Sequence, residues 1–116
     1  MRGELRAPAA SSADVSIPVE ILPEAQRLID EADVRWSTEH GFDAVNPLLD
    51  DILHAAELLR ENPGLGVVYS RGGFRNEVRR LLLRSGWHVY YRFHSSRGLV
   101  EIVSIWFANR GSGPPL

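Results

Sequence analysis

Arginine and aromatic residues in the second half of the chain have side chains that could bind phosphate and move a proton. They are Arg79, Arg80, Arg84, His88, Tyr90, Arg92 and Arg110. A guanidinium group binds phosphate or carboxylate through two parallel hydrogen bonds and stacks on aromatic rings. A neighbouring His or Tyr can transfer a proton or stack on a base. The alternative, slightly favoured by residue types alone, is that Trp87 and Tyr91 are core residues and the arginines are ordinary solvated strand positions.

Other catalytic and metal-binding patterns are missing from the sequence. The absence of cysteine excludes disulfides, thiolate nucleophiles and cysteine-based metal sites. The four histidines show neither H-x-x-x-H nor H-E-x-x-H spacing, and there is no G-x-S-x-G motif. The adjacent carboxylates Asp50 and Asp51 fit a solvated or N-terminal helix position better than acid–base catalysis. We therefore expect neither a metal ion nor a cofactor.

Charge is distributed unevenly along the chain, although the net charge is only −2. Residues 1–61 hold five arginines against thirteen acidic residues, whereas residues 62–116 hold eight arginines against two. A second half at +6 indicates an anionic partner, either nucleic acid or an acidic protein segment. An equally open alternative is that the two halves neutralise each other across the fold. All thirteen basic residues are arginine, for which a GC-rich genome is the simplest reason.

Length and composition indicate one globular domain. The chain has 116 residues, of which 44% are hydrophobic and 24% charged. No apolar run approaches the ~20 residues that span a bilayer, and the N-terminus lacks the apolar stretch of a secretory signal. We expect a cytoplasmic protein that does not enter a membrane. Residues 1–14, rich in Ala and Ser and without periodicity, are expected to form a flexible arm.

A short strand and two amphipathic helices are expected in the first half. Residues 16–22 are β-prone, and the proline within this run suggests a position at the edge of a sheet. Pro23 opens a helix that ends at Gly41, because apolar residues recur between them at helical spacing. A second helix runs from residue 43 or 46 to residue 61 and stops before Pro63. The short loop between the helices predicts an antiparallel hairpin.

The period then changes to two, and residues 67–70, 76–83, 86–93 and 99–107 are predicted strands. In the third strand, Trp87, Val89, Tyr91 and Phe93 share one face, with His88, Tyr90 and Arg92 on the other. The helical hairpin needs an apolar surface to cover, and the aromatic face supplies one. The register of residues 76–83 stays open because both faces carry Leu and Arg. The predicted fold is α+β, with helices on one side of a mainly antiparallel sheet and an arginine-rich open side.

Several short motifs in the second half follow one another in a characteristic order. They are P-x-x-G at residues 63–66, R-L-L at 80–82, W-H-V-Y-Y-R-F at 87–93 and V-E-I-V-S-I-W-F-A-N-R at 100–110. In order and spacing they resemble the RelE/ParE superfamily of bacterial toxins. The likeness covers about residues 15–112 and leaves a tail at 113–116. It implies the fold of that superfamily, an N-terminal strand, a helical hairpin and a C-terminal antiparallel sheet.

The resemblance also implies a function and a partner. It implies the growth-inhibiting toxin of a type II toxin–antitoxin, or plasmid stabilization, module, held in a hetero-oligomer by a small antitoxin. Residues that would bind the target or antitoxin are Arg79, Arg80, Arg84, Tyr90, Arg92, Trp106 and Arg110. An arginine-lined sheet suits an acidic, partly disordered segment that folds on binding.

Two mechanisms occur among proteins of this superfamily. RelE-like members cut mRNA on the ribosome, and the corresponding catalytic set here would be His88, Arg80, Arg92 and Arg110. ParE-like members lack such a set and inhibit DNA gyrase. Phe107 stands where many members have His, and a phenyl ring cannot transfer a proton. We favour the ParE-like reading, with the ribosome-dependent mRNA endonuclease as the alternative and a non-toxic interaction domain as a second alternative.

Overall fold

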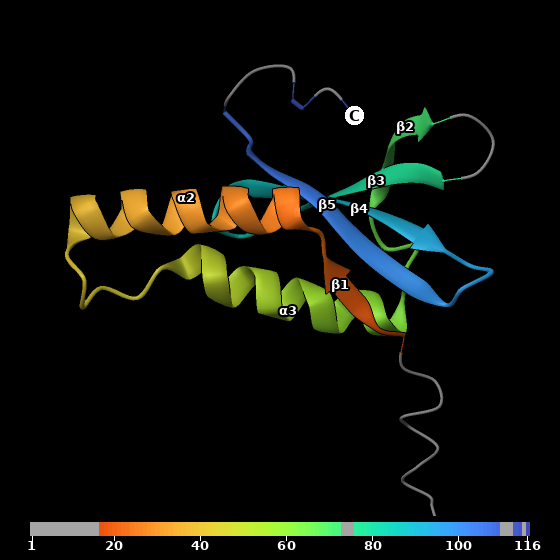
Figure 1. Cartoon of the computed structure of the whole chain (residues 1–116), viewed down its shortest axis with the longest axis horizontal. Helices are drawn as coiled ribbons and strands as arrows, with labels where there is room; N and C mark the ends of the chain where they lie inside the picture. The colour runs from red at the N-terminus through yellow and green to blue at the C-terminus, as the bar shows by residue number, and fades with distance from the viewer. Residues whose placement is uncertain (1–16, 73–75, 110–112, 115) are drawn as a thin grey trace, which may run out of the picture.

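The computed structural model describes residues 17–72, 76–109, 113–114 and 116. The arm expected at residues 1–14 lies outside these ranges, as does Arg110. The elements follow in the order β1 (Val19–Ile21), α2 (Pro23–His40), α3 (Pro47–Glu61), β2 (Val67–Gly72), β3 (Asn76–Leu82), β4 (Trp87–His94) and β5 (Leu99–Phe107). This order confirms the predicted α+β fold, and the helices lie side by side on one side of the sheet (Figure 1).

The five strands form one sheet in the order β1-β5-β4-β3-β2. Strands β2 to β5 are antiparallel, whereas β1 pairs in parallel with β5 and lies at the edge, as predicted from Pro18, which directly precedes β1. The pairing of β4 with β5 shifts by one residue between Tyr90 and Tyr91. These consecutive tyrosines point to opposite sides of the sheet, and each is at most 1% exposed.

Local signals at their ends explain why the two helices form where they do. Pro23 and Pro47 occupy the first turn, where the missing amide hydrogen would have no helical partner. The side-chain oxygen of Asn46 caps α3 by accepting from the Leu48 amide at 2.9 Å. Its amide nitrogen donates to Asp33 of α2 at 3.2 Å, so one residue both starts α3 and ties it to α2. Within the described ranges, neither helix has the length and apolar character needed to cross a membrane.

The main hydrophobic core lies between the helices and the sheet. Its buried members include Ala25, Ile29 and Ala32 of α2, Leu48, Ile52, Ala55 and Leu59 of α3, and Val89, Tyr91, Ile102 and Ile105 of the sheet. Trp87 and Phe93 pack against it, which confirms the helix-facing side predicted for β4. A smaller cluster of Val78, Tyr90 and Val103, with Tyr69 packed against it, lies on the opposite side of the sheet. The side of the sheet turned away from the helices therefore also carries buried apolar side chains.

Candidate functional site

We call the side of the sheet turned away from the helices the open face. Strand pairing places its residues, because side chains of directly opposed residues project to the same side. Arg80 lies opposite Tyr90, and His88 lies opposite Trp106. With Arg92, two residues beyond Tyr90 on β4, these five side chains share the open face. The sequence had predicted this side for His88, Tyr90 and Arg92.

Arg80 is positioned by aromatic rings on the open face. Its guanidinium carbon lies 5.7 Å from the centroid of the Tyr69 ring, within the range of a cation–π interaction. Tyr69 in turn packs edge-on against Tyr90, with the ring centroids 4.7 Å apart. Burial raises the pKa of Tyr90, and a hydrogen bond from Arg80 opposes that rise. Arg80 is thus positioned by the Tyr69 ring and by its hydrogen bond to Tyr90, and no carboxylate among the described residues forms an ion pair with it.

His88 lies beside this cation as a neutral imidazole. Burial, and then the positive charge of Arg80, lower the pKa of His88 from its usual value near 6.5. Its ring meets that of Tyr90 edge-on, with centroids 6.0 Å apart. A neutral imidazole at pH 7 accepts a hydrogen bond or a proton. The open face therefore combines a fixed positive charge with a neighbouring proton acceptor.

Arg92 supplies a second cation on the open face. Its Nε is buried and has no hydrogen-bond partner within the described part of the chain. Glu101 lies opposite Arg92 in the pairing of β4 with β5, but its carboxylate bonds instead to His94 Nε2 at 2.6 Å. A buried guanidinium nitrogen without a partner costs free energy that an anionic ligand would recover. Arg92 is thus suited to binding a carboxylate or phosphate.

The acidic helices do not neutralise these arginines. On α2, the carboxylates of Glu24 and Glu31 both pair with Arg27 of the same helix. Among the residues that the structure describes, no ion pair joins a carboxylate of α2 or α3 to an arginine of the sheet. The two oppositely charged halves of the chain are therefore not paired across the fold in this region.

Arg79 does not lie on the open face, unlike its neighbour Arg80 among the predicted binding residues. It lies opposite Tyr91 and donates to the carbonyl oxygen of Gly66 at 2.7 Å, while pairing with Glu77 at 2.9 Å. The cause is the strand period of two, which sends Arg79 and Arg80 to opposite sides. Arg84 is exposed and lies two residues beyond the end of β3.

The loop between α3 and β2 explains the P-x-x-G motif. The Tyr91 hydroxyl donates to the carbonyl oxygen of Pro63 and accepts from the amide of Gly66, both at 2.8 Å. A Cβ at Gly66 would lie 2.7 Å from the carbonyl oxygen of Arg80 and 2.9 Å from the Tyr91 hydroxyl. Only glycine fits so close an approach of two backbones. The motif therefore fixes the loop against the strand that carries Arg80.

Two further residues have packing and anchoring roles. Phe107 packs edge-on against Trp87, with ring centroids 5.4 Å apart, on the helix side of the sheet. Asp51 accepts from the backbone amide of Ser85 at 2.7 Å and so attaches the β3–β4 turn to α3. The solvated or dipole role predicted for Asp51 is corrected, because its carboxylate serves a distant amide.

Sequence reasoning missed Tyr69, which completes the aromatic floor under Arg80. Its hydroxyl donates to the carbonyl oxygen of Pro114 at 2.7 Å, so the C-terminal segment also reaches this face. In the sequence, Tyr69 is marked only by its place in a predicted strand, after two valines and before a serine. That signal does not say which strand lies beside it, and only the pairing of β2 with β3 brings Tyr69 to Arg80.

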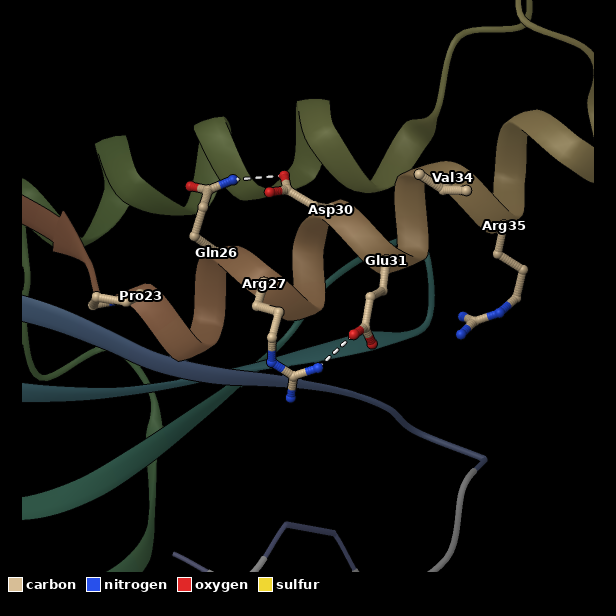
Figure 2. A pocket seen from close by; sticks show the side chains of 7 residues that line it. All are labelled: Pro23, Gln26, Arg27, Asp30, Glu31, Val34 and Arg35. Carbon is tan, nitrogen blue, oxygen red and sulfur yellow. Dashed lines mark hydrogen bonds and ion pairs between the residues drawn. The ribbon is translucent and has the colours of Figure 1, made fainter.

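The outward face of α2 carries a hollow of about 750 Å³, and Figure 2 shows the side chains that line it. It is lined by Pro23, Gln26, Arg27, Asp30, Glu31, Val34 and Arg35. Gln26 bonds to Asp30 at 2.9 Å, and Arg27 pairs with Glu31. Since most of its polar groups satisfy one another along a single helix, this hollow is a weaker candidate than the open face.

The fold is similar to that of chains in two solved toxin–antitoxin structures. One is a chromosomal ParDE system from P. aeruginosa, with a TM-score of 0.63 and 16% identity over 81% of this chain and 98% of that chain. The other is an archaeal RelE–RelB complex from Pyrococcus horikoshii OT3, with a TM-score of 0.59 and 12% identity over 83% and 99%. No family model and no curated protein sequence matches this chain. The chain has the RelE/ParE fold, which confirms the resemblance seen in its motifs at the level of the fold.

Proposed function

We propose that this protein is the toxin of a type II toxin–antitoxin module and that a cognate antitoxin neutralises it. The toxin domain extends over about residues 15–112. Its fold, shared with chains from two toxin–antitoxin assemblies, supports this assignment. The observation that carries the proposal is the open face, where Arg80 and Arg92 lack carboxylate partners among the described residues. Such a surface suits an extended acidic segment of the antitoxin that folds as it binds.

The toxin acts by binding its target, and DNA gyrase is the favoured target. Cleavage of RNA needs one group that accepts a proton and another that donates one. His88 is a proton acceptor, but the nearby Tyr90 is buried with a raised pKa, and Phe107 packs on the helix side. Arginine stabilises negative charge and is a poor base. These features support a ParE-like toxin without catalytic activity.

The second candidate is a ribosome-dependent mRNA endonuclease, and one observation favours it. A neutral His88 beside the Arg80 cation could accept a proton from a ribose hydroxyl while the guanidinium stabilises charge on the phosphate. In this reading Arg80, Arg92 and Arg110 bind phosphate and His88 is the base. Arg110 lies outside the described residues.

Inducible expression tests the toxin assignment. Expression of the chain alone should arrest growth, and co-expression of the gene next to its own, as the candidate antitoxin, should restore it. The Arg80→Gln/Arg92→Gln variant should relieve the arrest, because it removes the two cations that the structure describes on the open face. Arg97→Gln, at an exposed position in the β4–β5 turn, is the control and should remain toxic. A soluble, folded chain that causes no growth defect would instead indicate a non-toxic interaction domain.

Plasmid supercoiling and mRNA cleavage in the arrested cells distinguish gyrase from translated mRNA as the target. Inhibition of gyrase should change plasmid supercoiling and cause DNA damage, with no cuts in translated mRNA. An endonuclease should leave topology unchanged and produce codon-phased cuts in primer extension that disappear in His88→Ala. Unchanged topology together with such cuts would reverse our preference for gyrase.

A further inference from the structure

The C-terminal segment returns to the open face and binds at β2, next to which the chain ends in Figure 1. The Tyr69 hydroxyl donates to the carbonyl oxygen of Pro114 at 2.7 Å, and the Ser70 hydroxyl donates to that of Leu116 at 3.3 Å. Pro114 is buried. These contacts join residues about 45 positions apart, so the sheet surface itself provides a place for this segment.

The fit around Gly113 is closer than ordinary surface packing. A Cβ at this position would lie 2.8 Å from the Tyr69 hydroxyl oxygen and 3.2 Å from the Tyr90 hydroxyl oxygen. Gly113 also has a φ of +89°, a conformation that other residues rarely adopt. The first position of the segment therefore favours glycine, which allows the close approach to Tyr69 and Tyr90. The proline at the second position restricts the backbone of the segment.

We propose that Tyr69, Ser70 and Tyr90 form a binding slot for an extended Gly-Pro peptide segment, and that Gly113 and Pro114 of the chain itself fill it. Aromatic residues with a nearby hydroxyl donor bind proline-containing segments well, because such segments lose little backbone freedom on binding. The filled slot adjoins Arg80, which lies over the Tyr69 ring. A ligand that occupies this part of the open face must displace the C-terminal segment.

The segment is a strong competitor because it is tethered. A short linker gives a tethered ligand an effective concentration in the millimolar range, so even a weak contact fills its site. If about nine-tenths of the slots are filled from within the chain, a peptide added in solution binds about tenfold more weakly than to an empty slot. This inference goes beyond the toxin assignment and does not depend on the antitoxin.

Gly113→Ala is the variant that empties the slot, because the added methyl group collides with the Tyr69 hydroxyl. Gly41→Ala is its matched control, since Gly41 has a similar φ of +94° but nothing within 4 Å of an added Cβ. In NMR spectra, the nuclear Overhauser contact between the Tyr69 ring and Pro114 should be present in the unsubstituted chain and in Gly41→Ala. It should be lost in Gly113→Ala.

The probe is an acetylated, amidated Gly-Pro-Pro-Leu peptide, titrated while the Tyr69 and Tyr90 ring signals are followed. Gly113→Ala should bind it about tenfold more tightly than the unsubstituted chain and Gly41→Ala. Adding Tyr69→Phe to Gly113→Ala should weaken this binding, because the donor to the proline carbonyl is gone. Equal affinity for all chains, no binding to Gly113→Ala, or a persistent Tyr69–Pro114 contact in that variant would overturn the proposal. None of these results bears on the growth test of the toxin assignment.

Discussion

At the scale of a single residue, the pKa of His88 measures the electrostatic effect of the Arg80 cation on the open face. Burial and the Arg80 cation lower its pKa, so titration followed by NMR should give a value below 6.5. Arg80→Gln should raise the pKa of His88 toward that value, because only the effect of burial remains. Arg97→Gln, in the β4–β5 turn, should leave it unchanged. A His88 pKa that does not respond to Arg80→Gln would place the two groups too far apart for the site described above.

The same shift predicts how stability depends on pH. Because the pKa of His88 is lower in the folded state, the unfolded chain binds more protons between the two pKa values. The contribution of His88 is therefore complete above about pH 6.5 and is lost as the pH falls through the folded pKa. Urea unfolding at pH 7.5 and pH 5.5 should show this loss, and His88→Gln should reduce the difference between the two pH values.

Tyr91 carries a second residue-scale prediction. Tyr91→Phe removes the acceptor of the buried Gly66 amide and the donor to Pro63, which should lower the free energy of unfolding by about 2 kcal/mol. Tyr69→Phe is the comparison, since it also removes one hydroxyl, and it should cost about 1 kcal/mol or less at its half-buried site. Urea unfolding measures both. Equal costs would mean that the Pro63 loop is not held by the Tyr91 hydroxyl.

At the scale of elements, neighbouring carboxylates at the start of α3 have different roles. Asp51→Ala should destabilise the protein by about 2 kcal/mol, because Asp51 holds the Ser85 amide of the β3–β4 turn. Asp50→Ala should cost about 0.5 kcal/mol, since Asp50 is an exposed charge in the first turn of the helix. Hydrogen exchange at the Ser85 amide should accelerate only in Asp51→Ala. The reverse order of effects would contradict the anchoring role of Asp51.

The ends of the elements followed from residues close to each end. Helix α2 begins at Pro23 and ends before Gly41, and Asn46 caps the start of α3. Helix-breaking and capping residues act within one helical turn, so the sequence near each end predicts it. The register of β3 did not follow from the sequence, since leucine and arginine alternate on both faces. Pairing with β4 decided it by placing Arg80 opposite Tyr90.

At the scale of the whole molecule, the net charge of −2 hides a cationic surface. We expect retention on heparin at low salt, because local charge and not the net value governs binding to a polyanion. Arg80→Gln/Arg92→Gln should elute at lower salt than Arg35→Gln/Arg97→Gln, which has the same net charge but keeps the open face. Salt screens the charges and so weakens the binding of each variant to heparin. Elution of both variants at the same salt concentration would contradict a cationic open face.

The sequence by itself determined the order of the elements and the side of β4 that faces the helices. These depend on periodicity and on breakers that act over a few residues. Only the tertiary structure decided which guanidinium groups stay available to bind an anionic ligand. Arg79 and Arg80 are adjacent in the chain, yet one bonds to the Gly66 carbonyl and the other lies over Tyr69. The cause is long-range pairing, which brings distant residues together and leaves no local trace.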